Sequence, residues 1–409
     1  MRNSWDVIVI GAGPSGMMAA LTSAQRGRRT CIVEKNKVPG RKLAICGKGR
    51  GNITNQCDME DLMANIPGNN RFLYSSFSNF DNYSVIYFFE ENGVPTKVER
   101  GGRVFPVSDS AKDIVSCLVD KCNELGVRIY TNENVNRIEK QEDGSFYVKT
   151  SSGLELYSES LVMATGGKSY PATGSTGDGY RFAKSLGHSI VEPRPSLVPL
   201  VSPNKCCKEM QGLSLKNVAV DFFIDGNKVY SDFGEMMFTH FGVTGPVILS
   251  GSRGYGLPFN KGYISIDLKP ALDEETLDNR ILRDFGEAPN REFANSLNKL
   301  LPTKMIPVFI EKTGINPTRQ VNSITRQERQ AIVKLFKNFT IDITGPSGIN
   351  EAIVTAGGVS IKEVTPRTME SKVCPGLYFV GELLDVDGYT GGFNLTIAFS
   401  TGYTAGMNV

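Results

Sequence analysis

Three glycines near the start of the chain, Gly11, Gly13 and Gly16, have the spacing of a turn that binds a diphosphate. They follow an apolar run over 7–10, which predicts a buried parallel strand, and they precede an Ala- and Met-rich segment, which predicts a helix. In such turns the first glycine permits the sharp bend, the second lets the backbone approach a diphosphate, and the third lets helix and strand pack closely. The unpaired N–H groups at the helix start attract the phosphates.

A second apolar run, over 30–33, ends in Glu34. A carboxylate at this place accepts hydrogen bonds from a ribose 2′-hydroxyl and disfavours a 2′-phosphate. Because strand, turn, helix, second strand and acid follow in order, the sequence predicts a dinucleotide site instead of a fortuitous glycine turn. The Gly-, Lys- and Arg-rich residues 37–55 come next, and we expect their cations to meet phosphates or the polar edge of a flavin: Arg41, Lys42, Lys48 and Arg50.

Further elements at both ends of the chain must position this site. Capping and periodicity predict helices over 83–92 and 111–125, strands over 127–130 and 161–164, and a hairpin over 137–158. Near the C-terminus, a buried strand over 377–380 is followed by a Gly- and Asp-rich loop and a helix that begins at Asn394. The unpaired N–H groups of that helix start would stabilise a negatively charged ligand. We therefore expect the two ends of the chain to build one site.

The middle of the chain has a different pattern. Pro193, Pro195 and Pro199 indicate a boundary near 192, and short alternating strands with glycine turns over 197–268 predict a small β-barrel or sandwich. Segments 271–286, 291–301 and 324–338 have the apolar spacing of helices. The predicted α/β fold comprises a Rossmann-like domain, an inserted β-barrel-like domain and a helical insertion, with these bounds: 1–192 plus 350–409; 193–269 plus 339–349; 270–338.

Composition disfavours several classes of function. Forty-five basic and 43 acidic residues give a net charge of +2, so no global field favours nucleic acid or a membrane surface. The start MRNSW lacks the apolar segment of a signal peptide, and the apolar runs are of strand length, so we expect a cytoplasmic protein. Eight cysteines form no CxxC pair and only two histidines exist, so we expect no metal site and no redox dithiol.

The motif order GAGPSG, Glu34, a strand meander, ATGG and a late GLYFVGE resembles the flavoproteins with two dinucleotide-binding domains, which hold FAD. More narrowly, GRKLAICGKGRGNITN, ATGGKSYPATGSTGDGYRFAKSLGH, GEMMFTHFGVTGP and GLYFVGELLDVDGYTGGFN resemble the BaiN-like NAD(P)/FAD-dependent oxidoreductases. That three-domain bacterial family also resembles aminoacetone oxidase. Gly51 departs from the family pattern, which usually reads RCN, so a role for that cysteine is absent here unless Cys46 substitutes.

The resemblance implies a non-covalently bound FAD. The sequence contains no second GxGxxG turn, so either NAD(P)H docks transiently at the flavin face or electrons come from the substrate itself. For Asp178, helix capping and a bond to the cofactor are equally supported. The predicted cofactor-binding residues are Gly11, Gly13, Pro14, Ser15, Gly16, Glu34, Lys35, Arg41, Lys42, Arg50, Asn52, Thr54, Val135, Ala164, Thr165, Gly166, Asp178, Gly381, Glu382, Gly392, Phe393, Asn394 and Leu395.

His240 is the predicted proton-transfer residue, because a neutral imidazole can act as acid or base near pH 7; the competing interpretation is a turn histidine bonded to backbone. Arg50, Tyr170 and Tyr389 are alternatives for binding or protonating a substrate, whereas His188 is expected to cap a helix end. We expect a flavin-dependent reductase or dehydrogenase of a small organic molecule, steroid-like or an enone. An amine oxidase is the second hypothesis. A flavin protein acting on nucleic acid, or one without turnover, is the third, and near-neutral charge disfavours RNA.

Overall fold

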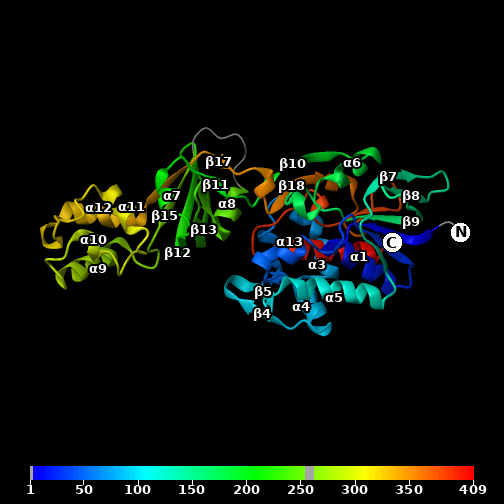
Figure 1. The fold of residues 1–409 in the computed structure, drawn as a ribbon, viewed down its shortest axis with the longest axis horizontal. Coiled ribbons are helices and arrows are strands. Elements are labelled where there is room, and N and C mark those ends of the chain that lie inside the picture. Colours follow the sequence, from blue (N-terminus) through cyan, green and yellow to red (C-terminus); the bar gives the residue numbers. More distant parts are fainter. Residues whose placement is uncertain (1–2, 254–261) are drawn as a thin grey trace. The chain divides into compact units, whose positions relative to one another are not determined.

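The computed structural model describes residues 3–253 and 262–409 (Figure 1). The chain divides into two compact units, Met1–Ser196 with Ile349–Val409, and Leu197–Gly348. The predicted boundary near 192 falls within strand β10 (Ile190–Ser196), which pairs antiparallel with β18 (Val354–Val359) and so belongs to the first unit. The predicted helical insertion lies in the second unit, together with the predicted β domain.

The main sheet of the first unit is built around β1, whose last four residues are buried. β1 pairs in parallel with β2 and β9, β6 extends the sheet beyond β2, and β19 pairs in parallel with β9. β7 and β8 join β9 as the predicted antiparallel meander, so the Rossmann-like fold is confirmed. The strands are β1 (Ser4–Ile10), β2 (Thr30–Val33), β6 (Arg128–Tyr130), β7 (Val135–Lys140), β8 (Phe146–Thr150), β9 (Glu155–Met163) and β19 (Leu377–Phe379).

Two helices from opposite ends of the chain, α1 (Pro14–Gln25) and α13 (Phe393–Gly406), pack closely against each other, and α1 also packs on this sheet (Figure 1). A Cβ atom at Gly402 would lie 2.4 Å from the Ser15 carbonyl oxygen, so a glycine is needed at this contact. The contact brings the predicted second helix start onto the N-terminal fold. The other elements of this unit are β3 (Thr54–Asn55), α2 (Met59–Ala64), α3 (Tyr74–Asn79), α4 (Asn82–Glu91), β4 (Thr96–Glu99), β5 (Arg103–Pro106), α5 (Ala111–Glu124) and α6 (Asp178–Ser185).

The second unit combines a seven-stranded antiparallel sheet with helices that share one hydrophobic core, which includes Ile264, Phe309 and Phe336. The strand order is β16 (Phe339–Ile343), β15 (Gly262–Asp267), β12 (Ser214–Ile224), β13 (Asn227–Phe238), β14 (Gly242–Thr244), β11 (Leu200–Val201) and β17 (Gly345–Pro346). The helices are α7 (Lys205–Glu209), α8 (Pro246–Ser252), α9 (Glu274–Gly286), α10 (Phe293–Ser296), α11 (Ile306–Thr313) and α12 (Arg326–Lys337).

The helix predicted over 291–301 is wrong for most of its length, because only Phe293–Ser296 is helical. Asn295, Ser296 and Asn298 favour local side-chain hydrogen bonds over a helix interior. Helix α11 was not predicted, although Pro307 near its start is favourable in a first turn. In the described part of the chain, no helix has the length and apolarity needed to cross a membrane.

Candidate functional site

In the turn between β1 and α1, two of the three glycines are required by the packing of the protein, and the third, Gly13, is not. A Cβ at Gly11 would lie 2.5 Å from the Ala164 carbonyl oxygen, and one at Gly16 would lie 2.0 Å from the Gly11 carbonyl oxygen. A Cβ at Gly13 would meet no atom within 4 Å, and Gly13 has an ordinary φ of −81°. Neither packing nor backbone conformation demands a glycine there. Open space at the start of α1 fits a diphosphate that approaches the backbone closely.

Glu34 is held beside this turn with its carboxylate already oriented. Its Oε2 accepts a hydrogen bond of 2.8 Å from the Ala12 N–H, and its Oε1 accepts bonds of 2.8 and 2.7 Å from the backbone and side-chain N–H groups of Asn36. The residue is only 7% exposed. A carboxylate can accept about four hydrogen bonds, so three donors leave capacity for one ribose hydroxyl.

The start of α13 is fixed by two neighbouring segments. A Cβ at Gly392, where φ is 105°, would lie 2.3 Å from the Thr54 carbonyl oxygen, so only glycine lets β3 approach. The Asn394 side chain accepts a bond of 2.9 Å from the Gly388 N–H and donates one of 2.8 Å to its carbonyl oxygen. The N–H groups of the first helical turn, over 393–395, lack acceptors within the helix. They lie at the second helix start that the sequence predicts, and its role in stabilising an anion stays a prediction.

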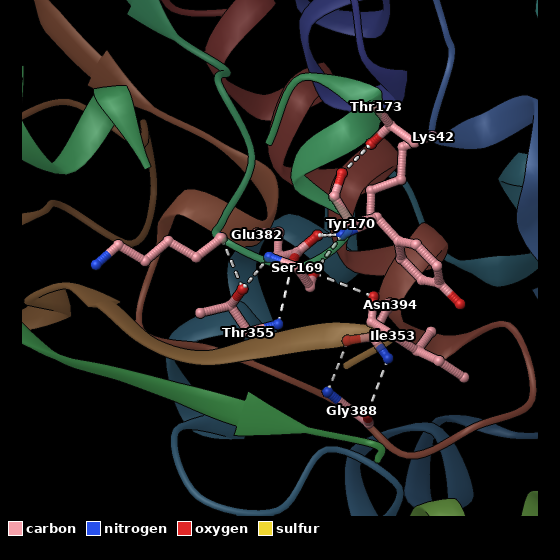
Figure 2. A network of polar contacts seen from close by, with 10 residues as sticks. Lys42, Ser169, Tyr170, Thr173, Ile353, Thr355, Glu382, Gly388 and Asn394 are labelled. Atoms are coloured by element: carbon pink, nitrogen blue, oxygen red, sulfur yellow. Dashed lines mark hydrogen bonds and ion pairs between the residues drawn. The ribbon is translucent and has the colours of Figure 1, made fainter. Parts of the chain in front are cut away.

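An ion-pair network links three of the predicted cofactor segments (Figure 2). The Lys42 Nζ atom lies 2.7 Å from Glu382 Oε2 and 2.6 Å from Ser169 Oγ, and Ser169 Oγ donates a bond of 2.8 Å to Glu382 Oε1. The Thr355 N–H donates to Glu382 Oε1 at 3.0 Å, and Thr355 Oγ1 accepts from the Ser169 N–H at 3.1 Å. The Lys42 and Glu382 side chains are 25% and 20% exposed, so the pair is largely shielded.

Arg50 has carboxylate partners that sequence reasoning missed. Its Nε donates a bond of 2.9 Å to Asp109 and its Nη1 donates one of 3.1 Å to Glu99, while the guanidinium lies 4.3 Å from the centre of the Phe105 ring. These hydrogen bonds raise the pKa of Arg50 above its usual value. The segment around 97–109 contributes both acids, and no local pattern relates it to the loop at 50. Cofactor binding by Arg50 stays a prediction.

Lys35 and Asp178 form an ion pair with an Nζ–Oδ2 distance of 2.8 Å. Asp178 is the first residue of α6, not its cap, since Gly177 precedes it. Burial raises the pKa of Asp178, but hydrogen bonds from Lys35 and Thr176 hold it below its usual value. This pair lies near the Asn36 side chain, which donates to the Thr173 carbonyl oxygen at 3.1 Å and accepts from Arg41 at 3.0 Å.

The other predicted cofactor residues have structural positions that fit the motif order. Asn52 donates to the carbonyl oxygens of Thr54 and Val104, and Thr54 Oγ1 lies 2.7 Å from Thr396 Oγ1. A Cβ at Gly381 would lie 2.6 Å from Ser15 Oγ, so η8 (Gly381–Leu383) approaches the first helix start. The remaining positions lie at the first residues of α1 or α13, or directly at strand ends: Pro14, Val135, Ala164, Thr165, Gly166, Phe393 and Leu395.

The two histidines have different surroundings. His240 is exposed in the second unit, between β13 and β14, and its ring contacts Phe241 edge-on at 4.9 Å. Its proton-transfer role stays a prediction. His188 is 3% exposed, its Nε2 lies 2.7 Å from Ser371 Oγ, and its N–H bonds the Ala183 carbonyl oxygen at the end of α6. Burial lowers the pKa of His188.

The surroundings of Cys46, which is partly buried, disfavour the reactive thiolate that would replace the family cysteine. Burial raises its pKa to about 12, which keeps the thiol protonated near neutral pH. At Gly51 φ is 80°, and a Cβ would lie 3.0 Å from the Ala111 Cα atom. Among the described residues, no group of three or more His, Cys, Asp or Glu side chains could hold a metal ion.

The fold and its two helix starts define a Rossmann-type flavoprotein. The family description "HI0933-like protein Rossmann domain" matches residues 5–408, so the chain belongs to the HI0933-like family. The ribosomal RNA dihydrouridine synthase of Escherichia coli is 31% identical over 405 residues, which cover 99% of this chain and 98% of that protein. The 3-dehydro-bile acid delta(4,6)-reductase of Clostridium scindens is 29% identical over 404 residues, with 97% of each chain covered.

A solved structure supports the fold. The 3-ketosteroid delta1-dehydrogenase of Sterolibacterium denitrificans superposes with a TM-score of 0.53 at 13% identity and 99% coverage of each chain. The predicted BaiN-like resemblance and the class of FAD-dependent oxidoreductase are confirmed. The predicted exclusion of nucleic acid is not supported, because a relative named for ribosomal RNA matches over nearly the whole chain. That exclusion used the net charge, which is insensitive to the local charges around a site.

Proposed function

We propose that this protein is an FAD-dependent reductase that saturates a C=C bond conjugated to a carbonyl group, with a uridine base in ribosomal RNA as substrate and NAD(P)H as electron donor. The observation that carries the proposal is similarity over nearly the whole chain to relatives with two different substrates. Dihydrouridine is uridine with its C5–C6 bond saturated, and that bond is conjugated to the C4 carbonyl. A 3-dehydro steroid with a Δ4 bond has the same conjugation.

Uridine is preferred because two ribosomal RNA dihydrouridine synthases, of E. coli and Haemophilus influenzae, are 31% and 30% identical to this chain over 98% of their lengths. A bile-acid-like steroid enone is the second candidate, favoured by the 29% identity to the reductase of C. scindens. Both substrates require the same reaction, a hydride delivered to the β-carbon and a proton delivered to the α-carbon.

The chain's own residues supply binding and electrostatics. FAD, when bound, supplies the hydride chemistry. The open backbone at Gly13 and the start of α1 would hold its diphosphate, and Glu34 would accept a ribose hydroxyl. The N–H groups at the start of α13 would stabilise negative charge on the reduced ring. The pair Lys42–Glu382 would hold the basic loop against the ATGG and GEL segments.

The test combines FAD-loaded protein and NADH or NADPH, without oxygen, with an unmodified ribosomal RNA transcript. A parallel reaction contains a 3-oxo-4-ene steroid. We expect mass spectrometry of the digested RNA to show a uridine that has gained two hydrogen atoms, and no such product without NAD(P)H. Reduction of the steroid alone would favour the second candidate. If neither compound is reduced and only an amine bleaches the flavin, the amine oxidase hypothesis replaces this proposal.

A further inference from the structure

Tyr170 has an unfavourable backbone conformation, and its side-chain hydroxyl makes no hydrogen bond with the described residues that would offset the cost. Its φ and ψ are 52° and 59°, in the left-handed region, which bulky residues rarely adopt. Pro171 follows, and a proline favours extended backbone in the residue before it. Seven described residues other than glycine have positive φ, and among them only Tyr170 precedes a proline. Such outliers persist only where the surroundings enforce them, and they gather at functional sites.

The surroundings of Tyr170 do enforce this conformation. Its carbonyl oxygen accepts bonds of 2.8 and 2.7 Å from the N–H and Oγ1 of Thr173. The preceding residue, Ser169, is fixed by Lys42 and Glu382 through its hydroxyl and by Thr355 through its N–H. The strained residue is therefore attached directly to the ion-pair network of the proposed cofactor site.

The second notable feature of Tyr170 is its phenol group. Its hydroxyl has no hydrogen-bond partner among the described residues, and the side chain is only partly buried. Figure 2 shows the ring directed away from the Glu382 carboxylate. A phenol supplies one O–H donor at the end of a planar apolar ring. It thus suits a planar, unsaturated ligand that carries a carbonyl oxygen.

We infer that Tyr170 contacts the substrate and donates a hydrogen bond to the carbonyl oxygen conjugated to the reduced C=C bond. The inference rests on the proposed function. FAD, when bound and reduced, would supply the hydride: its bond to that hydrogen breaks, the cofactor loses two electrons, and a C–H bond forms at the β-carbon. The C=C electron pair then moves between the α-carbon and the carbonyl carbon, and the carbonyl pair moves onto oxygen. The phenol stabilises this oxyanion without losing its proton. A proton from water then bonds to the α-carbon while the electron pair on oxygen re-forms the C=O bond, and NAD(P)H, oxidised to NAD(P)+, returns two electrons to the cofactor.

The test uses Tyr170→Phe, which retains the ring, with Tyr83→Phe on the exposed face of α4 as the matched control. FAD-loaded protein is reduced by NAD(P)H and then mixed, without oxygen, with the RNA transcript or the steroid enone. For Tyr170→Phe we expect reoxidation by the substrate to be about 100-fold slower, the effect of losing one oxyanion donor. Flavin reduction by NAD(P)H and the Kd for FAD should stay within about twofold of wild type. The control should match wild type throughout.

Tyr170→Gly provides a second measurement, because glycine adopts positive φ without strain. We expect Tyr170→Gly to have a higher Tm than wild type and to show the same slow reoxidation of the flavin. A gain in stability with a loss of activity is typical of a strained functional position. Reoxidation of Tyr170→Phe at the wild-type rate would overturn the inference while leaving the proposed function intact. Parallel losses in FAD binding and reduction would also overturn it, since they would indicate a structural role. If neither compound reoxidises wild-type flavin, the proposed function fails and the inference fails with it.

Discussion

Gly13→Ala should separate folding from cofactor binding. The added methyl group would meet no protein atom within 4 Å, and the backbone of Gly13 already has a φ that alanine adopts freely. Alanine reduces the entropy of the unfolded chain, which stabilises by about 0.4–1 kcal/mol. It is a poorer N-cap for α1 by about 0.5–1 kcal/mol. These two effects nearly cancel, so we expect the free energy of unfolding without FAD to change by less than about 1 kcal/mol.

FAD binding should respond very differently. The methyl group occupies the space through which a diphosphate would approach the start of α1, so at least one hydrogen bond to a charged phosphate is lost. Such a bond contributes about 1.5–3 kcal/mol, which corresponds to a Kd raised about 10- to 100-fold. The assay is a titration of apoprotein with FAD, followed by flavin fluorescence, beside urea unfolding of the same apoprotein.

Two further variants calibrate this result. Gly286→Ala, at the end of α9, also adds a methyl group that meets no atom within 4 Å, and it should leave FAD binding unchanged. Gly16→Ala would place a Cβ 2.0 Å from the Gly11 carbonyl oxygen and should destabilise the apoprotein by about 1–3 kcal/mol. Wild-type FAD affinity in Gly13→Ala would refute the reasoning, because the open space at Gly13 would then not be the diphosphate site.

Three other variants test separate parts of the account. Lys42→Met should lower the free energy of unfolding by about 1–2 kcal/mol in urea, because Glu382 loses its shielded partner. Lys149→Met, which removes an exposed ion pair, should leave the free energy of unfolding nearly unchanged, and equal effects of the two variants would contradict this. Burial lowers the pKa of His188 in the folded state below the value of about 6.5 expected in the unfolded chain. The buried neutral imidazole therefore contributes its full stabilisation above about pH 6.5, and this stabilisation is lost as the pH falls below that value. The urea midpoint should therefore fall less steeply with acid in His188→Gln, and an unchanged slope would contradict the assignment. His240→Ala should slow product formation with an unchanged Kd for FAD, and wild-type turnover would remove His240 from proton transfer.

Local patterns predict the cofactor fold well because each piece is short in sequence. The strand over 7–10, the glycine turn, the helix and Glu34 lie within one continuous segment, and they are found as β1, α1 and β2 with Glu34 bonded to the Ala12 N–H. The helix predicted over 111–125 is found at Ala111–Glu124, since apolar periodicity and the following glycine mark both its face and its end.

The missed features depend on residues far apart in the chain. Arg50 meets Glu99 and Asp109 only because β4 and β5 fold back beside the loop at 50, and no periodicity encodes that contact. The pairing of β10 with β18 joins segments separated by the whole second unit. The residue before Tyr170, Ser169, is likewise held by Lys42, Thr355 and Glu382, which lie far from it in the sequence. The sequence shows which residue types occur at these positions, but it does not show which of them meet in the folded protein.

The most direct test of the central claim follows the flavin of wild-type protein that has been reduced by NAD(P)H in the absence of oxygen. The account predicts that an unmodified ribosomal RNA transcript reoxidises this flavin and that about one dihydrouridine forms for each flavin reoxidised. A flavin that stays reduced in the presence of both the RNA and the steroid enone, and is reoxidised only when oxygen is admitted, would contradict it.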